Sequence, residues 1–546
     1  MQRPRYAEAV QSFRWPAVLD ALGWNGRAHV NLGETVVDRP ALNGRGQRAA
    51  LIWVGAGGAE QTITYRELSQ ASARVARLLG QLGVRKGDRV ATLMPRVPET
   101  FALILGILKA GAVFVPIFAG FGPDSVRFRL QHSGARLLCT HHEHRHQVPE
   151  HSGVERILSV PPPGGCVREG DIDYHAALAG VDARFDPVPC RRDEPAAIIY
   201  TSGSTGQPKG CTIAVNMLAA IWPYLRYGVD LREDEDLFWP TGDPGWGYGL
   251  CCYLPAFAAG ATVLCIQRNL DARRCLETLA ARRVTNLATT PTLLRALMAL
   301  GEDEVRRAGA PVRVISSCGE PLNGEVVEFF RRACGTTPMD HFGATEFALP
   351  IGNYNAVDMA VKPGSMGLPS PGYRMTVMDD AGRELPAGNT GLMGRHSDEN
   401  TLYWTGYWND PEASARARRG DWISTGDLAR RDADGYFWFE GRFNDIIKSA
   451  GYRIGPFEVE SAILKHAAVA EAAVIGKPDA ARGEIVKAFV VLKSGIARTD
   501  ALAEEIVERV KRDLGRHQYP REIEFVEELP KTQTGKIQRF LLRQRA

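Results

Sequence analysis

The hydrophobic positions of the chain follow two alternating periods from about residue 64 onward. One period is helical, with apolar residues three, four or seven positions apart at Leu68, Val75, Leu78, Leu79 and Leu82. The other is a short apolar run, typical of a buried strand, found at residues 90–93, 111–117, 136–140, 196–200, 262–266, 286–290 and 312–317. Because a helical pattern follows each run, we predict an α/β fold of layered, mostly parallel sheets with flanking helices. Ligands of such folds bind at the carboxyl ends of the strands.

A second, smaller domain is predicted at the C-terminus, because the pattern changes after Gly441. The elements expected there are, in order, helix 457–465, strands 469–476 and 487–493, helix 501–514 and strand 521–526. They make an α+β unit of about 100 residues, a usual size for an independent domain. We therefore predict a large domain, residues 1–443, and a small domain, residues 444–546. Residues 149–193, rich in Pro, Gly and charge, are expected to form a surface excursion.

Composition limits the classes of function. The 546 residues include 66 Lys and Arg against 63 Asp and Glu, a formal net charge of +3, and 45% are hydrophobic. A chain of this length exceeds what one hydrophobic core supports, in agreement with two domains. The balanced charge gives no support for a nucleic-acid-binding protein or for a disordered chain. The composition does not exclude binding of small anionic ligands, since local charges suffice to bind them.

The cysteines and the apolar runs indicate a cellular compartment. The ten cysteines show no C-x-x-C spacing and mostly stand in apolar runs, so we expect buried thiols in a reducing environment without a disulfide framework or zinc ribbon. The N-terminal segment is polar and offers no signal-peptide core. The longest apolar run, Phe101–Leu108, is far shorter than the ~20 residues that a membrane span needs. We therefore expect a cytoplasmic protein without a membrane span.

The strongest chemical signal is Tyr200–Gly210, YTSGSTGQPKG, which adjoins a predicted buried strand. Its glycines, hydroxyls and lysine can surround an anion with N–H groups, O–H groups and a positive charge. The Walker A and Rossmann patterns do not fit. The alternative is a flexible Gly/Ser linker, but a linker has no reason to end in Pro-Lys-Gly beside a buried strand. The predicted phosphate contacts are Thr201, Ser202, Gly203, Ser204, Thr205, Gly206 and Lys209.

This loop resembles the signature phosphate loop of the adenylate-forming superfamily, which holds acyl-CoA synthetases, adenylation domains of peptide synthetases, and luciferases. Further motifs follow in the order of that family across nearly the whole chain. They are GEP at 319–321, FGATE at 342–346, STGD at 424–427, GR at 441–442, GYR at 451–453 and PKTQTGK at 530–536. The segment 442–460 and SFRW near the N-terminus are most similar to the acetyl and medium-chain acyl-CoA synthetase branch.

The resemblance implies a nucleotide site. Besides the phosphate loop it comprises Gly319, Glu320, Pro321, Asp340, His341, Phe342, Gly343, Ala344, Thr345, Asp427, Arg442 and Lys536. The segment Gly319–Leu322 resembles the loop that packs its backbone on adenine, and Asp427 is implied to bind the ribose hydroxyls with the help of Arg442. Without the surrounding motifs, a helix N-cap would be the better interpretation of Asp427.

The resemblance gives catalytic roles to Lys209, Thr345, Glu346 and Lys536. Glu346 is the implied Mg²⁺ ligand, since a lone carboxylate beside phosphate oxygens is a usual way to hold that ion. The alternative for Glu346 is an exposed acidic residue at a helix start. Lys536 stabilises the charge of the transferring phosphoryl group, for which a point charge on a flexible stem is suited. Without the resemblance it is an ordinary exposed lysine.

The resemblance also implies that the small domain rotates between two states. After the rotation, Gly451, Tyr452 and Arg453 face the cleft in which the thiol of coenzyme A attacks the acyl-adenylate. The family places the hinge at Asn444, where most relatives carry Asp or Lys. Asparagine departs from that pattern, yet it tolerates the φ and ψ change that a hinge absorbs.

The acyl pocket is expected around Trp246, Gly247, Tyr248, Cys318 and Gly343. In acetate-specific relatives a tryptophan at the position of Gly343 closes the floor of the pocket, and a valine stands at the position of Gly247. Glycine at both positions implies a deeper, wider pocket and an acid larger than propionate. Gly343→Trp is then expected to shift the preference toward the shortest acids. The alternative is that Gly343 serves backbone geometry alone.

The implied activity is that of an acid–thiol ligase, an AMP-forming acyl-CoA synthetase. A carboxylate and ATP give acyl-AMP and pyrophosphate, then CoA gives acyl-CoA and AMP, with Mg²⁺ as cofactor. Two alternatives stay open: an enzyme of one half-reaction only, and a pseudoenzyme that binds nucleotide or acyl-adenylate. Lys209, Glu346 and Lys536 are all present, which favours the complete enzyme. A homodimer and a role in fatty acid metabolism are compatible with this interpretation.

Two further clusters carry weaker signals. The run HHEHRH at 141–146 could ligate a transition metal, but the interleaved acid and arginine favour a solvated turn. Cys251 and Cys252 are adjacent in an apolar stretch, and we interpret them as core residues and not as a redox pair.

Overall fold

The computed structural model describes residues 3–201, 208–268, 271–442, 445, 447–449, 452–479, 482–514, 518–531 and 537–546. The chain forms two compact units. Unit 1 comprises Met1–Pro363, Gly367–Arg374 and His396–Ile423, and unit 2 comprises Gly364–Met366, Met375–Arg395 and Ser424–Ala546. The predicted domain boundary at residue 443 thus falls within unit 2. That the small domain turns at this boundary stays a prediction.

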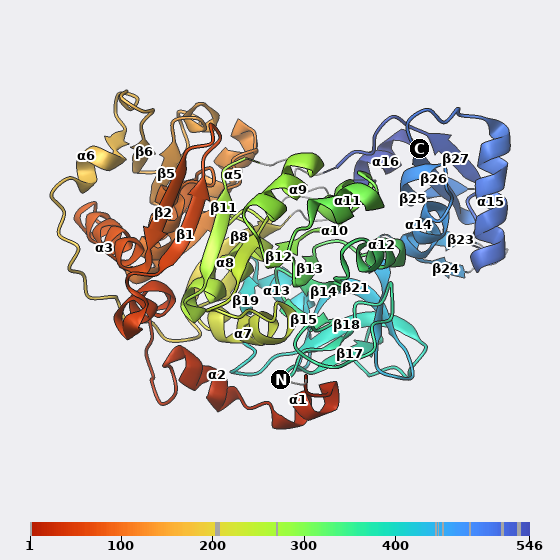
Figure 1. The fold of residues 1–546 in the computed structure, drawn as a ribbon, viewed down its shortest axis with the longest axis horizontal. Helices are drawn as coiled ribbons and strands as arrows, with labels where there is room; N and C mark the ends of the chain where they lie inside the picture. The colour runs from red at the N-terminus through yellow and green to blue at the C-terminus, as the bar shows by residue number, and fades with distance from the viewer. Residues whose placement is uncertain are drawn as a thin grey trace. The chain divides into compact units, whose positions relative to one another are not determined.

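The first large sheet of unit 1 has nine strands (Figure 1). Their order is β16 (Leu368–Pro369), β15 (Ala348–Gly352), β14 (Pro338–Ala344), β13 (Val314–Cys318), β12 (Asn286–Thr289), β10 (Leu237–Pro240), β11 (Thr262–Ile266), β1 (Ala49–Val54) and β2 (Glu60–Thr64). The pairs from β14 to β1 are parallel, and antiparallel pairs lie at both edges. The α/β prediction with mostly parallel sheets is confirmed.

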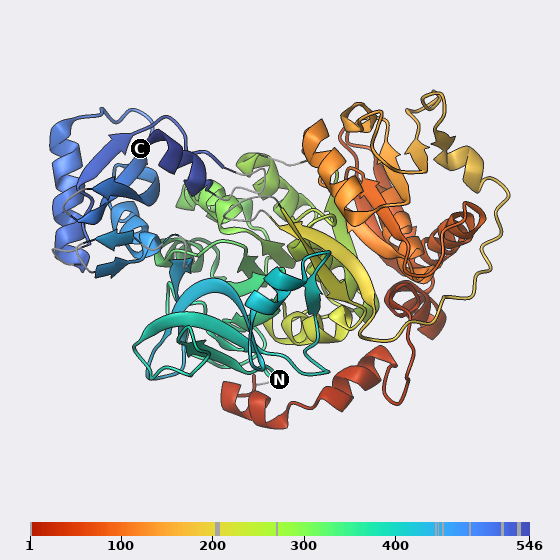
Figure 2. The same cartoon turned by 180° about the vertical axis from the view of Figure 1, so that it is seen from behind.

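The second large sheet of unit 1 has eight strands, and Figure 2 shows it from the other side. Their order is β19 (Trp404–Tyr407), β9 (Lys209–Ala214), β8 (Pro195–Thr201), β4 (Val113–Pro116), β3 (Arg89–Leu93), β5 (Leu137–His141), β6 (Arg156–Val160) and β7 (Ile172–Asp173). The expected helix after β8 is wrong, because β9 returns antiparallel to it. The expected surface excursion at 149–193 contains β6 and β7, which extend this sheet.

Helices cover these sheets. The α-helices of unit 1 are α1 (Tyr6–Ser12), α2 (Trp15–Leu22), α3 (Tyr65–Gln81), α4 (Pro98–Lys109), α5 (Pro123–Ser133), α6 (Tyr174–Leu178), α7 (Met217–Pro223), α8 (Gly247–Ala259), α9 (Ala272–Ala281), α10 (Pro291–Met298), α11 (Glu302–Ala308), α12 (Gly324–Cys334) and α13 (Pro411–Arg416). Short π-helical turns occur at η1 (Glu34–Asp38), η2 (Ala41–Arg45) and η4 (Tyr224–Gly228). Helix α3 shows why the pattern predicts correctly: Thr64 and Glu67 form a capping box, and the apolar face is buried.

Unit 2 contains two smaller sheets. One joins β17 (Met375–Met378), β18 (Thr390–His396), β21 (Trp422–Arg431) and β22 (Phe437–Arg442), and β20 (Arg418–Arg419) of unit 1 pairs with the first residues of β21. The other joins β24 (Tyr452–Ile454), β23 (Ile447–Ser449), β26 (Gly483–Leu492), β25 (Val469–Asp479) and β27 (Glu522–Phe525), with helices α14 (Pro456–Leu464), α15 (Asp500–Leu514) and α16 (Arg539–Arg545). The elements expected after residue 456 are all present within a few residues of their predicted bounds.

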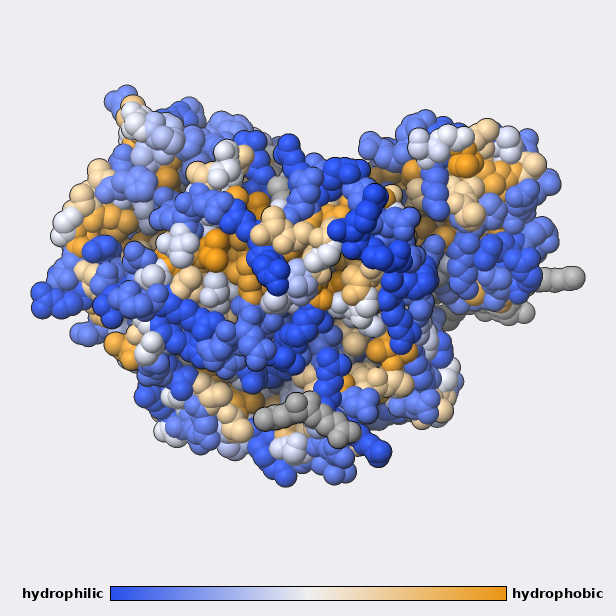
Figure 3. Space-filling view, in the orientation of Figure 1, coloured by the Kyte–Doolittle hydropathy of each residue, from blue (hydrophilic) through white to orange (hydrophobic). Residues whose placement is uncertain are grey.

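The burial of side chains agrees with the sequence patterns. None of the ten cysteines, all in the described ranges, forms a disulfide, and eight of them are buried, Cys251 and Cys252 included. Hydrophilic residues predominate on the face shown in Figure 3, where hydrophobic ones form small separate groups. Among the described residues, no helix has both the length and the apolar character that crossing a membrane requires.

Candidate active site

Strand pairing fixes the two ends of the predicted phosphate loop. Thr201 is the last residue of β8 and Lys209 the first of β9, and the two stand opposite each other in the antiparallel register. The segment between them therefore begins and ends on adjacent strands at the same end of the sheet, as an anion-binding loop requires. The other predicted contacts, Ser202, Gly203, Ser204, Thr205 and Gly206, lie outside the described residues.

Glu346 follows β14 and is nearly buried, with 8% of its surface exposed. Its Oε1 accepts a hydrogen bond of 2.7 Å from the hydroxyl of Tyr407. Burial, reinforced by the Glu346 carboxylate, raises the pKa of the neighbouring Cys211 thiol well above its usual range. In the described ranges Glu346 forms no ion pair with a lysine, arginine or histidine. A buried carboxylate of this kind fits a metal-ion ligand, which agrees with the predicted role.

Lys209 and Thr345 lie near this carboxylate. The Nζ of Lys209 is 4.9 Å from the centroid of the Tyr407 ring, within the range of a cation–π contact. Thr345 is half-buried, and its Oγ1 lies 3.9 Å from the point where a Cβ on Gly247 would stand. The structure thus brings the end of the phosphate loop and the FGATE motif around one tyrosine.

The GEP loop follows β13. Gly319 has φ of +101°, a conformation that favours glycine. The carboxylate of Glu320 accepts hydrogen bonds from Thr292 (2.7 Å) and Arg295 (2.5 Å), both within α10. This side chain therefore ties the loop to α10, and the contact of the loop backbone with adenine stays a prediction.

Asp340 and His341 are interior residues of β14, with 8% and 2% of their surfaces exposed. Burial raises the pKa of the Asp340 carboxyl well above its usual range, opposed by the backbone N–H groups of Leu322 and His341. Burial lowers the pKa of His341 to about 4. Its ring lies 5.1 Å from that of Tyr224 and 6.3 Å from that of Tyr354, measured between centroids. The side chains of Asp340 and His341 thus belong to the interior of the domain. Phe342, Gly343 and Ala344, at the end of the strand, are half-buried.

The predicted acyl residues gather at the start of α8. Trp246 is its N-cap, and its ring packs against Phe118 and Phe121 with centroids 5.6 and 6.1 Å away. The hydroxyl of Tyr248 lies 3.0 Å from that of Tyr224 on η4. Cys318 ends β13 in a buried position beside this tyrosine pair, and burial raises the pKa of both tyrosines well above their usual range.

The two glycines expected to enlarge the pocket have different surroundings. A Cβ on Gly343 would stand 2.5 Å from the carbonyl oxygen of Ala348 and 3.1 Å from the side chain of Leu349. The close approach of β14 and β15 therefore requires glycine at position 343, which is the alternative considered above. Gly343→Trp would thus disturb the backbone and not only fill the acyl pocket. Among the described residues, a Cβ on Gly247 would meet only the Thr345 hydroxyl within 4 Å. Of these two glycines, Gly247 is therefore the one that adjoins open space.

In unit 2, Asp427 on β21 stands opposite Arg442 on β22. Its Oδ1 accepts a hydrogen bond of 3.1 Å from Nε of Arg442, and its Oδ2 accepts one from the hydroxyl of Thr425. Asp427 has 3% of its surface exposed, whereas Arg442 is exposed. Strand pairing therefore places the predicted ribose-binding pair in contact, and Asp427 is not a helix N-cap.

Several predicted residues of unit 2 lie outside the described residues, namely Asn444, Gly451 and Lys536. Tyr452 and Arg453 form part of β24, and their side chains also lie outside the description. The helix that follows Lys536 is well anchored: Arg539 donates two hydrogen bonds to Glu460, at 2.7 and 2.8 Å.

Sequence reasoning missed two residues of the site, Tyr407 and Cys211. Both belong to the strand pair of β19 and β9, where they stand opposite each other. Cys211 lies two residues after Lys209, so its place beside the phosphate loop could have been inferred. Tyr407 had no such signal, because its position depends on a strand far away in the sequence.

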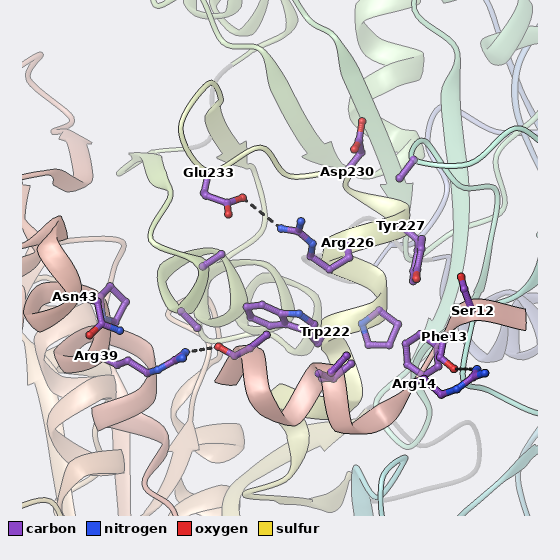
Figure 4. A pocket seen from close by; sticks show the side chains of 18 of the residues that line it. Ser12, Phe13, Arg14, Arg39, Asn43, Trp222, Arg226, Tyr227, Asp230 and Glu233 are labelled. Carbon is purple, nitrogen blue, oxygen red and sulfur yellow. Dashed lines mark hydrogen bonds and ion pairs between the residues drawn. The ribbon is translucent and has the colours of Figure 1, made fainter. Parts of the chain in front are cut away.

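A separate cavity of about 710 Å³ lies under the N-terminal segment of unit 1 (Figure 4). Phe13 and Arg14 lie at one end of it, Arg39 at the other, and Trp222 and Tyr227 form part of the opposite wall. The Phe13 ring packs against Tyr227 and the Trp15 ring against Tyr373, with centroids 6.5 and 6.1 Å apart, so the SFRW segment anchors the N-terminal segment on the rest of unit 1. Among the described residues, no predicted site residue lines this cavity.

Family models match most of the chain. The model described as AMP-binding enzyme matches residues 38–401, and the model described as AMP-binding enzyme C-terminal domain matches residues 458–536. The acetyl-coenzyme A synthetase of Bacillus subtilis is 36% identical, over 98% of this chain and 94% of that protein. The mitochondrial acyl-coenzyme A synthetase ACSM5 of Homo sapiens is 35% identical, over 90% of this chain and 86% of that protein.

Solved structures of acyl-CoA-forming enzymes are also similar to this chain. The acyl-CoA synthetase of Brucella canis is 39% identical with a TM-score of 0.79, covering 99% of both chains. The benzoate CoA ligase of Burkholderia xenovorans is 30% identical with a TM-score of 0.82, covering 94% of this chain and all of the other.

Proposed function

The chain belongs to the AMP-binding enzyme family, and we propose that it converts a carboxylic acid larger than propionate into its CoA thioester. Its class is that of the AMP-forming acyl-CoA synthetases, acid–thiol ligases that use ATP and CoA and proceed through acyl-AMP. The observation that carries the proposal is the short distance of 3.9 Å between Thr345 Oγ1 and the Cβ position on Gly247. A carboxylate bound in front of α8 would thus lie beside the predicted phosphate contacts.

In the first half-reaction, a carboxylate oxygen attacks the α-phosphorus of ATP and pyrophosphate leaves. The barrier falls when the reactants are held in line and the growing negative charge is balanced by fixed donors. We assign this work to the phosphate loop with Lys209, to Thr345, and to Lys536 of the small domain. Asp427 and Arg442 hold the ribose, and the backbone of 319–321 packs on adenine.

Glu346 is the residue that would hold Mg²⁺, and its nearly buried carboxylate without an ion pair in the described part of the chain suits that role. When bound, the ion would neutralise charge on the phosphate oxygens of ATP. Tyr407 and Cys211 surround the same carboxylate and limit its exposure to water.

In the second half-reaction, the thiol sulfur of CoA attacks the acyl carbonyl, the bond from that carbon to the AMP oxygen breaks, and the thiol proton is released. We propose that residues 444–546 turn about Asn444 between the two steps, so that Gly451, Tyr452 and Arg453 replace Lys536 at the reacting centre. A cytoplasmic location and a homodimer belong to the same proposal.

The size of the acid is proposed from Gly247 alone, because Gly343 faces the backbone of the β14–β15 hairpin. Acetyl-CoA synthetases stand among the relatives, so the family by itself does not decide between short and longer acids. The open space at Gly247 favours the longer ones.

Two assays test the function. ATP–pyrophosphate exchange that depends on an added carboxylate reports the first half-reaction, and thioester formation from synthetic acyl-AMP and CoA reports the second. We expect both activities. Exchange without thioester would identify an acyl-AMP ligase, thioester formation without exchange an enzyme of the second step only, and neither activity a binding protein.

A further inference from the structure

We propose that Tyr407 is a positioning residue for adenylation, which orients Glu346 through its hydroxyl and keeps Lys209 apart from that carboxylate through its ring. This inference rests on the proposed function, because it assumes that Glu346 and Lys209 serve ATP and its metal ion.

Tyr407 contacts both charged residues at once. Its hydroxyl donates to Glu346 Oε1 at 2.7 Å, and its ring centroid lies 4.9 Å from Nζ of Lys209. In the described part of the chain, Lys209 and Glu346 form no ion pair with each other. The neutral side chain of Tyr407 therefore contacts both the negatively charged Glu346 and the positively charged Lys209.

The position of this tyrosine is determined by the fold and not by the two charges. Tyr407 ends β19, where it pairs with Cys211 of β9. Its backbone N–H donates to the hydroxyl of Ser414 at 2.7 Å, and its ring packs edge-on against Trp404 with centroids 5.0 Å apart. The side chain is thus held from its own strand and from α13, which suits a residue that orients others.

A neutral donor has an advantage over a cation at this position. Arginine or lysine would neutralise Glu346 and compete with a metal ion for it. A hydroxyl fixes one carboxylate oxygen and leaves the charge of the group available. The ring likewise holds Lys209 by a weak cation–π contact, which a phosphate oxygen can replace. Without the ring, Lys209 and Glu346 could form an ion pair that withdraws both from the nucleotide.

Two variants separate the two parts of this role. Tyr407→Phe keeps the ring and removes the hydroxyl, so the Mg²⁺ concentration for half-maximal exchange should rise roughly tenfold, the effect of losing one hydrogen bond to a charged group. The KM for ATP at saturating Mg²⁺ should stay within about twofold of the wild type. Tyr407→Leu removes ring and hydroxyl, so both the Mg²⁺ requirement and the KM for ATP should rise. Thioester formation from synthetic acyl-AMP should be unchanged in both.

A binding measurement without turnover supports the kinetics. Free Mn²⁺, followed by electron paramagnetic resonance in the presence of α,β-methylene-ATP, reports metal affinity directly. Tyr407→Phe should weaken this affinity by a similar factor. Tyr403→Phe is the matched control, because it also removes a buried hydroxyl, one that lies 3.4 Å from the sulfur of Cys251 and not beside Glu346.

A double variant tests whether the hydroxyl acts through Glu346. In the Glu346→Gln background, Tyr407→Phe should add less than about twofold, since the carboxylate that it orients is gone. Equal effects of Tyr407→Phe in the two backgrounds would overturn the proposal, as would a Tyr407→Phe variant with the metal dependence of the wild type or a control variant that matches it.

The outcomes also distinguish this inference from the proposed function. If the wild type shows no carboxylate-dependent exchange yet binds Mn²⁺ with the nucleotide analogue, the proposed function fails, and the Mn²⁺ titration still decides the role of the hydroxyl. If the wild type binds no Mn²⁺ with that analogue, both fail.

Discussion

Gly247→Val is the substitution that most directly tests which acid fits the site. Gly247 is the first residue of α8, and in the part of the chain that the structure describes the only heavy atom within 4 Å of a Cβ placed there is Thr345 Oγ1, at 3.9 Å. A Cβ can therefore be added at this position without a clash with the described residues. It would occupy the space in front of α8 that we assign to the acyl chain.

The expected magnitude follows from the volume that is lost. Valine adds three carbon atoms, so about three methylene groups of a long acid lose their place. At about 0.8 kcal/mol for each buried methylene, this amounts to about 2.4 kcal/mol, or roughly 50-fold in kcat/KM. The kcat/KM for octanoate and hexanoate should fall by this factor, while that for acetate stays nearly constant because acetate does not reach the lost space.

The assay is the steady-state kcat/KM for acetate, propionate, hexanoate, octanoate and benzoate in the wild type and in Gly247→Val. Gly343→Ala is a useful control, because its Cβ would stand 2.5 Å from the Ala348 carbonyl oxygen. We expect this control to lower stability without a change in chain-length preference. A wild-type profile that peaks at acetate, or a folded Gly247→Val variant with an unchanged profile, would refute the reasoning.

Three further predictions concern other parts of the chain. Lys536→Ala should reduce adenylation by a factor on the order of 10² or more and leave much of thioester formation from synthetic acyl-AMP, because it removes charge stabilisation from the first step only. Asn444→Pro should slow acyl-CoA formation more than adenylation, since it fixes φ at the proposed hinge. His341 has a pKa of about 4 against an ordinary value of 6.5, so the wild type should lose about 3 kcal/mol of unfolding free energy as the pH falls from 6.5 to 4, a loss that His341→Leu should not show.

Each of these predictions has a contradicting result. Equal losses in the two half-reactions would show that Lys536 does not serve adenylation specifically. A proline variant with wild-type turnover of the full reaction would place the hinge elsewhere. For His341, the sign follows from its depressed pKa: protonation below pH 6.5 favours the unfolded chain. Parallel pH dependence of denaturant unfolding in wild type and variant would therefore contradict the burial argument.

The sequence predicts the central strands well because buried parallel strands are continuous apolar runs. The run 262–266 is β11 residue for residue, and the run at 90–93 is β3 without its first residue. The pattern after β8 predicts a helix where the return strand β9 lies, because the pairing of β9 with β8 depends on partners along the sheet and not on the local sequence. The edge strand β19 pairs with β9 across a long stretch of sequence, which no local pattern reveals.

The same distinction holds for the site. Motif residues such as Lys209 and Glu346 could be predicted because their chemistry and spacing stand in the sequence. The contact of Tyr407 with both of them could not, since it arises from tertiary pairing. The interpretation of Gly343 as open space was incomplete for a related reason: the direction of a missing Cβ depends on how closely β15 approaches β14.

The most direct test of the central claim follows oxygen through the complete reaction. The enzyme is supplied with ATP, CoA and an acid whose carboxylate carries oxygen-18, and the nucleotide product is analysed by mass spectrometry. A reaction through acyl-AMP predicts AMP that carries one labelled oxygen, because the oxygen that attacks phosphorus stays with the nucleotide when the thiol takes the acyl group. Unlabelled AMP, or ADP with label in inorganic phosphate, would contradict the account.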